Sequence, residues 1–253
     1  SKCQKMNKLR YFTIFFLLIT FSLTKPSYSK QFNYYADLVK DWPKIFPDHP
    51  VVRNDILDYY IEIEHFDKMV SRALQSLEKL GQLDNTIVVV TSDHGMPFPR
   101  AKASLHDDGS RVPLAIRWPE GIKGSGRVSN KIVNLSALAP TFIEAAGLTV
   151  PDMMTASSII DIFQNKSLVD HSSAFIAMER HDGCRAGGKG YPCRAIRTKE
   201  FLYILNHEPE RWPAGNPDRE FCARYIPFGE VDSSPTKSLL MENKNKIDFK
   251  RFY

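Results

Sequence analysis

Residues 86–113 read TIVVVTSDHGMPFPRAKASLHDDGSRVP, and this stretch decides the fold class. Residues 86–91 are all β-branched, which is typical of a strand buried on both faces. The run ends at Ser92, so the strand would deliver Asp93 and His94 to its carboxyl end. Ligands of open α/β sheets bind beyond the carboxyl ends of the strands. The adjacent carboxylate and imidazole are therefore candidate metal ligands.

The elements predicted around this strand alternate between helix and strand. Apolar residues at three- and four-residue spacing over residues 53–80 indicate an amphipathic helix that ends at Gly81. A helix, a turn and then a strand favour a parallel or mixed α/β sheet. Further along the chain we expect strands at 112–118 and 127–133, a helix at 135–146, a loop with a short helix at 151–165, and strands at 173–178 and 194–206 with a hairpin turn at Lys199-Glu200. Few periodic apolar positions follow residue 208.

The composition is that of a globular chain with a core. Apolar residues make up 43% of the 253 positions. The formal net charge is +5, but residues 1–30 contain six Lys and Arg and no acidic residue. The remainder is close to neutral and contains no basic helix or aromatic-basic stripe. We therefore exclude nucleic acid as a partner.

The first 30 residues have the pattern of a secretory leader. Basic residues follow Met6, an apolar run covers residues 11–23, and small residues come next. We expect cleavage after Ser29 and export to the periplasm or the extracellular space. A membrane anchor is the alternative, but the run is shorter than the roughly 20 residues that a spanning helix needs. We assign no function to residues 1–5.

Several motifs after the predicted strand are joined by fixed spacing. Thr-Ser-Asp-His-Gly ends at Gly95, Met-Pro-Phe-Pro follows at 96–99, and Lys102 stands seven residues before a Gly-Ser-Arg-Val-Pro motif at 109–113. Together they resemble the sulfatases of the alkaline-phosphatase-like superfamily, and among these the heparan N-sulfatase-like branch. The resemblance runs from about residue 51 to the C-terminus and includes residues 195–199 and 212–215.

The resemblance implies the fold and the organisation of the chain. The fold would be α/β, with part of an alkaline-phosphatase-like mixed sheet flanked by helices and a smaller antiparallel C-terminal sheet. We divide the chain into upstream residues and a leader at 1–30, the C-terminal half of a catalytic domain at 31–170, and a truncated C-terminal subdomain at 171–253.

The resemblance also assigns roles to particular residues. Asp93 and His94 would bind a divalent metal, which we expect to be calcium, with manganese or zinc as alternatives because calcium prefers oxygen ligands and His94 offers a nitrogen. Lys102 would place its ammonium group on the sulfate. Arg180 and His181 follow a predicted strand near which the family places part of its substrate pocket.

Each of these residues also has a structural interpretation. Asp93 could cap a turn, Lys102 could be a solvated loop lysine, and His181 could be a surface histidine. Arg111 would brace its loop rather than touch the substrate. The polar residues 106–108 could reach the mouth of the pocket or simply form a loop.

Sulfatases make their nucleophile, a formylglycine, from Cys or Ser in a Cys/Ser-x-Pro/Ala-x-Arg motif, and an Asp pair completes their metal site. We expect both to be absent from this sequence. The chain would then be an incomplete sulfatase that is inactive alone, and a separately encoded N-terminal half could complement it. Cys184 and Cys193 bracket a Gly-rich loop and could form a disulfide or remain free thiols.

The expected activity is hydrolysis of sulfate esters or sulfamates on carbohydrates, with a sulfated carbohydrate as the substrate. One alternative is a phosphodiesterase or phosphonate hydrolase of the same superfamily, because Asp-His-Gly also serves phosphoryl chemistry. The spacing from Lys102 to Pro113 argues against it. Another alternative is a binding protein for sulfated glycans that has no catalytic activity.

Overall fold

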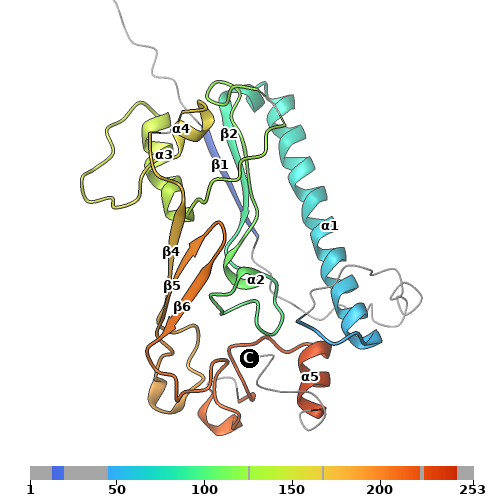
Figure 1. Cartoon of the computed structure of the whole chain (residues 1–253). Helices are drawn as coiled ribbons and strands as arrows, with labels where there is room; N and C mark the ends of the chain where they lie inside the picture. Colours follow the sequence, from blue (N-terminus) through green and yellow to red (C-terminus); the bar gives the residue numbers. More distant parts are fainter. Residues whose placement is uncertain (1–12, 20–44, 125, 167, 223–224, 244–253) are drawn as a thin grey trace, which may run out of the picture.

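The computed structural model describes residues 13–19, 45–124, 126–166, 168–222 and 225–243 (Figure 1). Two three-stranded sheets organise these residues. Sheet A has the order β1-β2-β3, with β1 at Thr13–Ile19, β2 at Thr86–Ser92 and β3 at Leu114–Arg117. Sheet B has the order β4-β5-β6, with β4 at Ser173–Met178, β5 at Cys193–Thr198 and β6 at Leu202–Asn206.

Sheet A is mixed and is centred on the predicted strand. β2 pairs with β1 in parallel and with β3 in antiparallel orientation. β2 is buried along almost its whole length, as its run of β-branched residues predicts. The α/β fold class with a smaller antiparallel C-terminal sheet is confirmed.

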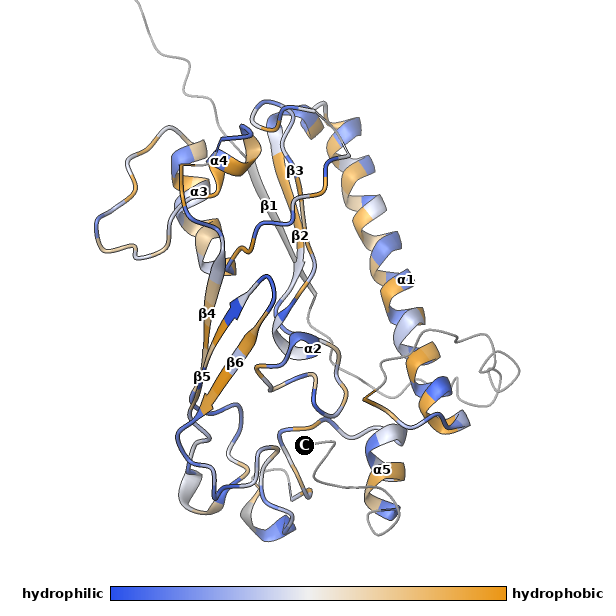
Figure 2. Ribbon diagram, viewed as in Figure 1, coloured by the Kyte–Doolittle hydropathy of each residue, from blue (hydrophilic) through white to orange (hydrophobic). Residues whose placement is uncertain are grey.

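Helix α1, Pro50–Lys79, confirms the amphipathic helix and leads through a 3-10 turn at Leu83–Asn85 into β2. It begins three residues earlier than predicted. Pro50 occupies its first turn, and the His49 side chain accepts a hydrogen bond from the Val51 N–H at 3.2 Å. Hydrophobic and hydrophilic residues alternate along the helix (Figure 2). Tyr60, Ile63 and Met69 of its apolar pattern are exposed, so only the first turns of the helix are deeply buried.

The opposite side of sheet A is covered by the predicted helix and the short helix after it. A 3-10 turn at Leu135–Ala137 continues into α3, Leu138–Ala145, and α4 follows at Ile160–Phe163. Gly147 has φ 74°, the left-handed conformation that ends a helix. Seven buried residues form the shared core, namely Ile87, Val89, Ala137, Leu138, Ile159, Ile160 and Phe163.

Sheet B confirms the predicted hairpin at its predicted turn. β4 pairs with β5 and β5 pairs with β6, all antiparallel. The Thr198 N–H donates to the Phe201 carbonyl oxygen at 2.8 Å, which closes the turn around Lys199-Glu200. The division of the chain into domains near residue 170 stays a prediction.

The strand predicted at 127–133 is wrong. These residues are described as an irregular segment, and the Ile132 N–H donates to the His171 carbonyl oxygen at 3.0 Å. Polar residues at 129–131 are exposed, so the segment lacks the buried alternating face that would hold a strand in a sheet.

A helix that the sequence analysis does not predict lies near the C-terminus. α5 spans Pro235–Glu242, and the Ser234 side chain accepts a hydrogen bond from the Lys237 N–H at 3.1 Å. The Ser-Pro start is a helix signal, but the helix is short and its apolar pattern is weak. Two further short helices are α2, Asp107–Ser110, and a 3-10 turn at Arg219–Phe221.

The predicted leader overlaps a strand of sheet A. β1 pairs in register with β2, from Thr13 opposite Thr86 to Ile19 opposite Ser92. Cleavage after Ser29 would remove this strand from the sheet. Residues 13–19 of the apolar run therefore form a sheet strand in this structure, and the leader and its cleavage stay a prediction. Among the described residues, none of the helices combines the length and the apolar content needed to cross a membrane.

Of the two alternatives for Cys184 and Cys193, a disulfide or free thiols, the structure shows free thiols. Both residues are buried reduced thiols, and the neighbour of the Cys184 sulfur is the Cys222 sulfur, at 3.1 Å. Cys193 packs instead with Leu105 and Ala195 in the core beneath sheet B. The Gly-rich loop therefore begins and ends in two different parts of the core.

Candidate functional site

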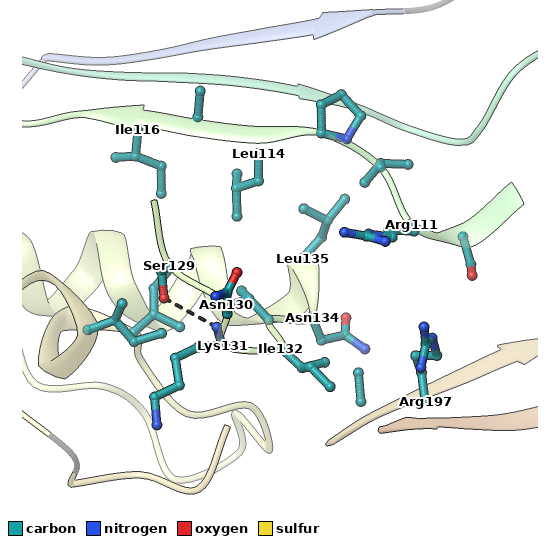
Figure 3. Close-up of a pocket in the computed structure, with 18 of the residues that line it drawn as sticks. Arg111, Leu114, Ile116, Ser129, Asn130, Lys131, Ile132, Asn134, Leu135 and Arg197 are labelled. Carbon is teal, nitrogen blue, oxygen red and sulfur yellow. Dashed lines mark hydrogen bonds between the residues drawn. The ribbon is translucent and has the colours of Figure 1, made fainter. Parts of the chain in front are cut away.

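An open cavity of about 2480 Å³ lies between the two sheets. Its walls come from β3, from residues 126–135 and from β4 and β5. Figure 3 shows Leu114 and Ile116 of β3 facing the irregular segment across the cavity, with Arg111 and Arg197 at one end. The segment that fails to form the predicted strand therefore forms one wall of this cavity.

Four of the five predicted site residues line this cavity. Asp93, His94, Lys102 and His181 belong to its wall. Arg180 does not, because its guanidinium donates to the Gly188 carbonyl oxygen at 3.1 Å in the adjacent loop. The metal pair, the lysine and the histidine thus line one cavity, and the arginine side chain contacts the adjacent loop instead.

The metal pair presents an oxygen and a nitrogen close to each other. His94 Nδ1 lies 2.8 Å from the Gly95 carbonyl oxygen, which can only accept, so Nδ1 carries the proton. In the tautomer with this proton, Nε2 has a lone pair, and it lies 3.6 Å from Asp93 Oδ2. These two atoms fit a metal ion as a pair of ligands.

The described residues supply only part of a metal site. They contain no group of three or more His, Cys, Asp and Glu side chains arranged around a metal position. Calcium takes six to eight oxygen ligands, so Asp93 and His94 alone would bind it weakly. An ion held here would need further ligands from water, substrate or another polypeptide.

Gly95 joins the strand end to the Gly-Ser-Arg-Val-Pro motif. Its N–H donates to the Gly109 carbonyl oxygen at 2.9 Å. A Cβ atom on Gly95 would lie 1.7 Å from the Asp108 carbonyl oxygen, so only glycine fits against that backbone. This close contact explains why the two motifs occur together, because the second packs directly on the first.

Lys102 is held by both its backbone and its side chain. Its N–H donates to the Met96 carbonyl oxygen at 2.9 Å. Its Nζ donates to Asp232 Oδ2 at 2.7 Å, and the two side chains are only 13% and 19% exposed. Lys102 is therefore not a solvated loop lysine. Asp232 is 130 residues away in the chain and belongs to no local motif, so the sequence carries no signal for this contact.

His181 stands at the wall of the cavity near Lys102. Its pKa is lowered, first by the loss of water around the ring and then by the Lys102 charge. Glu230, Asp182 and Asp232 act in the opposite direction. The ring is therefore neutral at neutral pH, and it can donate one hydrogen bond and accept another.

The polar residues 106–108 are partly structural. Asp107 accepts two hydrogen bonds from the Arg197 guanidinium, at 2.8 and 3.0 Å, and both side chains line the cavity. Burial lowers the pKa of His106. Arg111, which we expected to brace its loop, lines the cavity as well (Figure 3). Arg111 and Arg197 are two wall residues that the sequence analysis did not assign to the site.

The expected absence of a Cys-x-Ala-x-Arg motif needs a correction, because residues 193–197 read Cys-Arg-Ala-Ile-Arg. They form strand β5 of sheet B. Cys193 is 4% exposed, its pKa is raised by burial, and it does not line the cavity. The match is therefore a strand pattern whose cysteine is in the core, and it supplies no nucleophile to this cavity.

Comparison with known proteins gives two family matches. The sulfatase family profile matches residues 15–148, and the profile described as "N-sulphoglucosamine sulphohydrolase, C-terminal" matches residues 97–212. The first match begins inside β1, which agrees with the place of this strand in sheet A.

Individual proteins are similar to parts of the chain. An "Ulvan-active sulfatase" of Formosa agariphila is 28% identical over 80% of this chain and 30% of its own length. The human "N-sulphoglucosamine sulphohydrolase" is 28% identical over 65% of this chain and 33% of its own length. This chain thus spans about a third of the length of these relatives. The structure of BT4656 in complex with D-glucosamine-2-N,6-O-disulfate has the same fold, with a TM-score of 0.51, 21% identity, and coverage of 88% of this chain and 46% of that chain.

Proposed function

We propose, because this chain belongs to the sulfatase family, that the cavity between the two sheets is the part of a carbohydrate-sulfatase pocket that holds a divalent metal and a sulfate group. One observation carries the proposal. Asp93, His94 and Lys102, which follow β2, and His181, which follows β4, line the same cavity. A sulfated carbohydrate is the proposed ligand, and sulfate esters or sulfamates are the proposed substrate class.

The residues of the cavity suit the chemistry of sulfate transfer. Cleavage of the bond between sulfur and the sugar oxygen or nitrogen leaves negative charge on the sulfate oxygens and on the leaving atom. The Lys102 ammonium has three N–H groups, of which Asp232 accepts one, so the others can reach sulfate. His181, neutral at neutral pH, can hydrogen-bond the sugar without a charge.

The proposed metal would be bound by Asp93 Oδ2 and His94 Nε2. A divalent ion in such a site gathers sulfate oxygens and withdraws electron density from sulfur. Calcium is the proposed ion, and the imidazole ligand makes manganese or zinc the alternatives. Export of the chain stays a prediction of the sequence.

We further propose that the chain alone binds its ligand without turnover. A sulfatase needs a nucleophile near the sulfur, and the one cysteine in a Cys-x-Ala-x-Arg pattern is buried in sheet B. The nucleophile could be supplied by a separately encoded polypeptide of the same family. Binding alone is the function that the described residues support.

The test is a binding titration of the purified 253-residue chain with D-glucosamine-2-N,6-O-disulfate, followed by NMR, with Ca²⁺ or Mn²⁺ present and with EDTA. Unsulfated glucosamine is the control ligand. We expect the disulfated sugar alone to shift signals of the cavity residues. Lys102→Ala should abolish the shifts, and the exposed Lys189→Ala should keep them. Absence of binding under all of these conditions would overturn the proposal.

A parallel assay addresses turnover. The chain is incubated with 4-nitrocatechol sulfate and the same metals, and release of the chromophore is measured. We expect none. Release of the chromophore that disappears in the Lys102→Ala variant would show that the chain has its own nucleophile. It would contradict the proposal that the chain alone binds its ligand without turnover.

A further inference from the structure

The segment at residues 228–237, which we call the C-terminal strap, is fixed by buried polar contacts on both sides of Asp232. Before it, Glu230 accepts hydrogen bonds from the Arg185 guanidinium at 2.7 and 3.0 Å, and the two side chains are 1% and 3% exposed. After it, Lys237 Nζ donates to the Phe228 and Val231 carbonyl oxygens at 2.9 and 2.8 Å. The strap is therefore folded back on itself.

A third contact attaches the strap to the main helix. The Thr236 N–H donates to Asp55 Oδ2 of α1 at 2.9 Å. Asp55 is buried, and burial raises its pKa although Thr236 and Ser234 donate hydrogen bonds to it. Figure 1 shows α5 beside the start of α1. The strap thus links the N-terminal part of α1 to the loop of Lys102.

Buried charges are costly unless their hydrogen bonds are nearly complete. Arg185 meets this condition, because it also donates to the Trp212 and Pro213 carbonyl oxygens. Such a network fixes one conformation of the backbone. Asp232 lies between these anchors, so its carboxylate has little freedom to move relative to Lys102.

The place of Asp232 is unusual for a pocket that binds anions. A carboxylate facing the ligand would repel sulfate, but Asp232 does not line the cavity, whereas Lys102 does. The carboxylate accepts a hydrogen bond from the ammonium at 2.7 Å. This contact restrains a long, flexible side chain of the cavity wall and uses one of the three N–H groups of the ammonium.

We propose that Asp232 is the positioning residue for Lys102, which makes the C-terminal strap a part of the sulfate pocket. This inference rests on the proposed function for the role of Lys102. Without the carboxylate, the Lys102 side chain would become ordered only when the ligand binds. The conformational entropy lost at that point would weaken ligand binding.

The test compares Asp232→Asn, the conservative Asp232→Glu and the exposed control Asp218→Asn. The first readout is the ¹⁵N NMR spectrum of the lysine ammonium groups, with Lys102→Arg used for assignment. We expect a slowly exchanging Lys102 signal in the unmodified chain, its loss in Asp232→Asn, and no change in Asp218→Asn. The second readout is the Kd for D-glucosamine-2-N,6-O-disulfate, which should rise roughly tenfold in Asp232→Asn and less in Asp232→Glu.

The outcomes separate the two proposals. A Lys102 signal that is unchanged in Asp232→Asn overturns the positioning role, whatever the sugar does. A Lys102 signal that is lost in Asp232→Asn supports the positioning role of Asp232. If the unmodified chain gives this signal but binds no sugar, the proposed function is overturned and the positioning role is not. Tighter sugar binding by Asp232→Asn would mean that Asp232 acts as a competing anion, and it would overturn the inference.

An independent observation concerns Cys184 and Cys222. Their sulfurs lie 3.1 Å apart, and the residues are 0% and 2% exposed. A Cβ atom on Gly229 would lie 2.1 Å from the Cys222 sulfur and 2.5 Å from the Cys184 sulfur. Glycine at this position therefore leaves the space that the two adjacent sulfurs occupy.

We infer that Cys184 and Cys222 form a disulfide when the chain folds with a small-molecule disulfide such as oxidised glutathione. The two thiols lose two protons and two electrons, a sulfur–sulfur bond forms, and glutathione disulfide is reduced to two thiols. Burial raises the pKa of the Cys184 thiol, so the reactive thiolate is scarce in the folded chain. Oxidation should therefore be fast during folding and slow afterwards.

The chain is refolded in a glutathione redox buffer in a Cys3→Ser background, alkylated, digested without reduction and analysed by mass spectrometry. We expect a linked peptide containing Cys184 and Cys222, with Cys193 alkylated. Cys193→Ser should keep the link, and Cys222→Ser should abolish it. Three alkylated cysteines, or a link that contains Cys193, would overturn the inference.

Discussion

Arg197 of β5 and Asp107 of α2 form a two-point ion pair that joins sheet B to the Gly-Ser-Arg-Val-Pro loop. The Nε and Nη2 atoms of the arginine lie 2.8 and 3.0 Å from the two carboxylate oxygens. The pair spans 90 residues of sequence, and both members line the cavity. It therefore sets the distance between two walls that no continuous element connects.

Breaking this pair should loosen the cavity more than it destabilises the chain. The side chains are 24% and 41% exposed, so solvent screening limits the expected loss of unfolding free energy in Arg197→Met to about 1 kcal/mol. Arg197→Lys should lose most of the same amount, because lysine cannot bind both oxygens. Urea unfolding of the single variants, of Asp107→Asn and of the double variant measures the coupling. If the double variant loses as much unfolding free energy as the sum of the two single variants, a direct interaction between Arg197 and Asp107 is contradicted.

The buried pair of Arg185 and Glu230 should behave differently. Glu230→Gln leaves the arginine charge without its partner in the core, and we expect a loss of about 3–5 kcal/mol in unfolding free energy. The exposed pair of Arg117 and Asp84 is the matched control, with side chains 38% and 88% exposed, and Asp84→Asn should cost less than about 1 kcal/mol. Similar losses in the two variants would show that burial does not govern these pairs.

The free energy of unfolding of the chain should decrease in mild acid, partly because of His106. Burial lowers its pKa below the ordinary value of 6.5, so the folded state binds this proton less readily than the unfolded state. The contribution of His106 to the free energy of unfolding is then fully present above about pH 6.5, and it decreases as the pH falls toward the pKa of the folded state. His106→Asn should lose less unfolding free energy than the unmodified chain between pH 7.5 and pH 5.5. The exposed His65→Asn is the control, and equal slopes in all three proteins would refute the assignment.

The metal pair can be tested without any enzymatic assay. Mn²⁺ broadens the NMR signals of residues close to it, and we expect the broadening to centre on residues 93–95. Asp93→Asn and His94→Ala should each remove the effect, whereas Asp152→Asn, an exposed carboxylate outside the cavity, should not. Because the described residues offer two ligands, the affinity should be low. Broadening that persists in Asp93→Asn would place the ion elsewhere.

The parts of this fold that the sequence predicts are those encoded by local patterns. The β-branched run gives β2, apolar spacing gives α1, and the hairpin residues give sheet B with its turn. The prediction of a strand at 127–133 is wrong because a short pattern of apolar and polar residues does not show whether a neighbouring strand edge is available for pairing. The apolar run of β1 was open to the same ambiguity, since a buried strand and a leader share their composition.

The residues of the candidate site also differ in whether the sequence predicts them. Asp93, His94 and Lys102 could be named because they lie within one short motif-bearing stretch. Asp232 could not, since its contact with Lys102 depends on how the C-terminal strap folds against the rest of the chain. The contact of the Cys184 sulfur with the Cys222 sulfur, rather than with Cys193, follows from packing and not from spacing.

The parallel pairing of β1 with β2 also has a kinetic consequence. The two strands are neighbours in sheet A, yet the chain between them runs from residue 20 to residue 85 and contains α1. Such a pairing has to close a long loop before any of its hydrogen bonds form, whereas β5 and β6 are joined by a three-residue connection. Sheet B should therefore acquire amide protection early in refolding, and the edge of sheet A formed by β1 should be the last to do so.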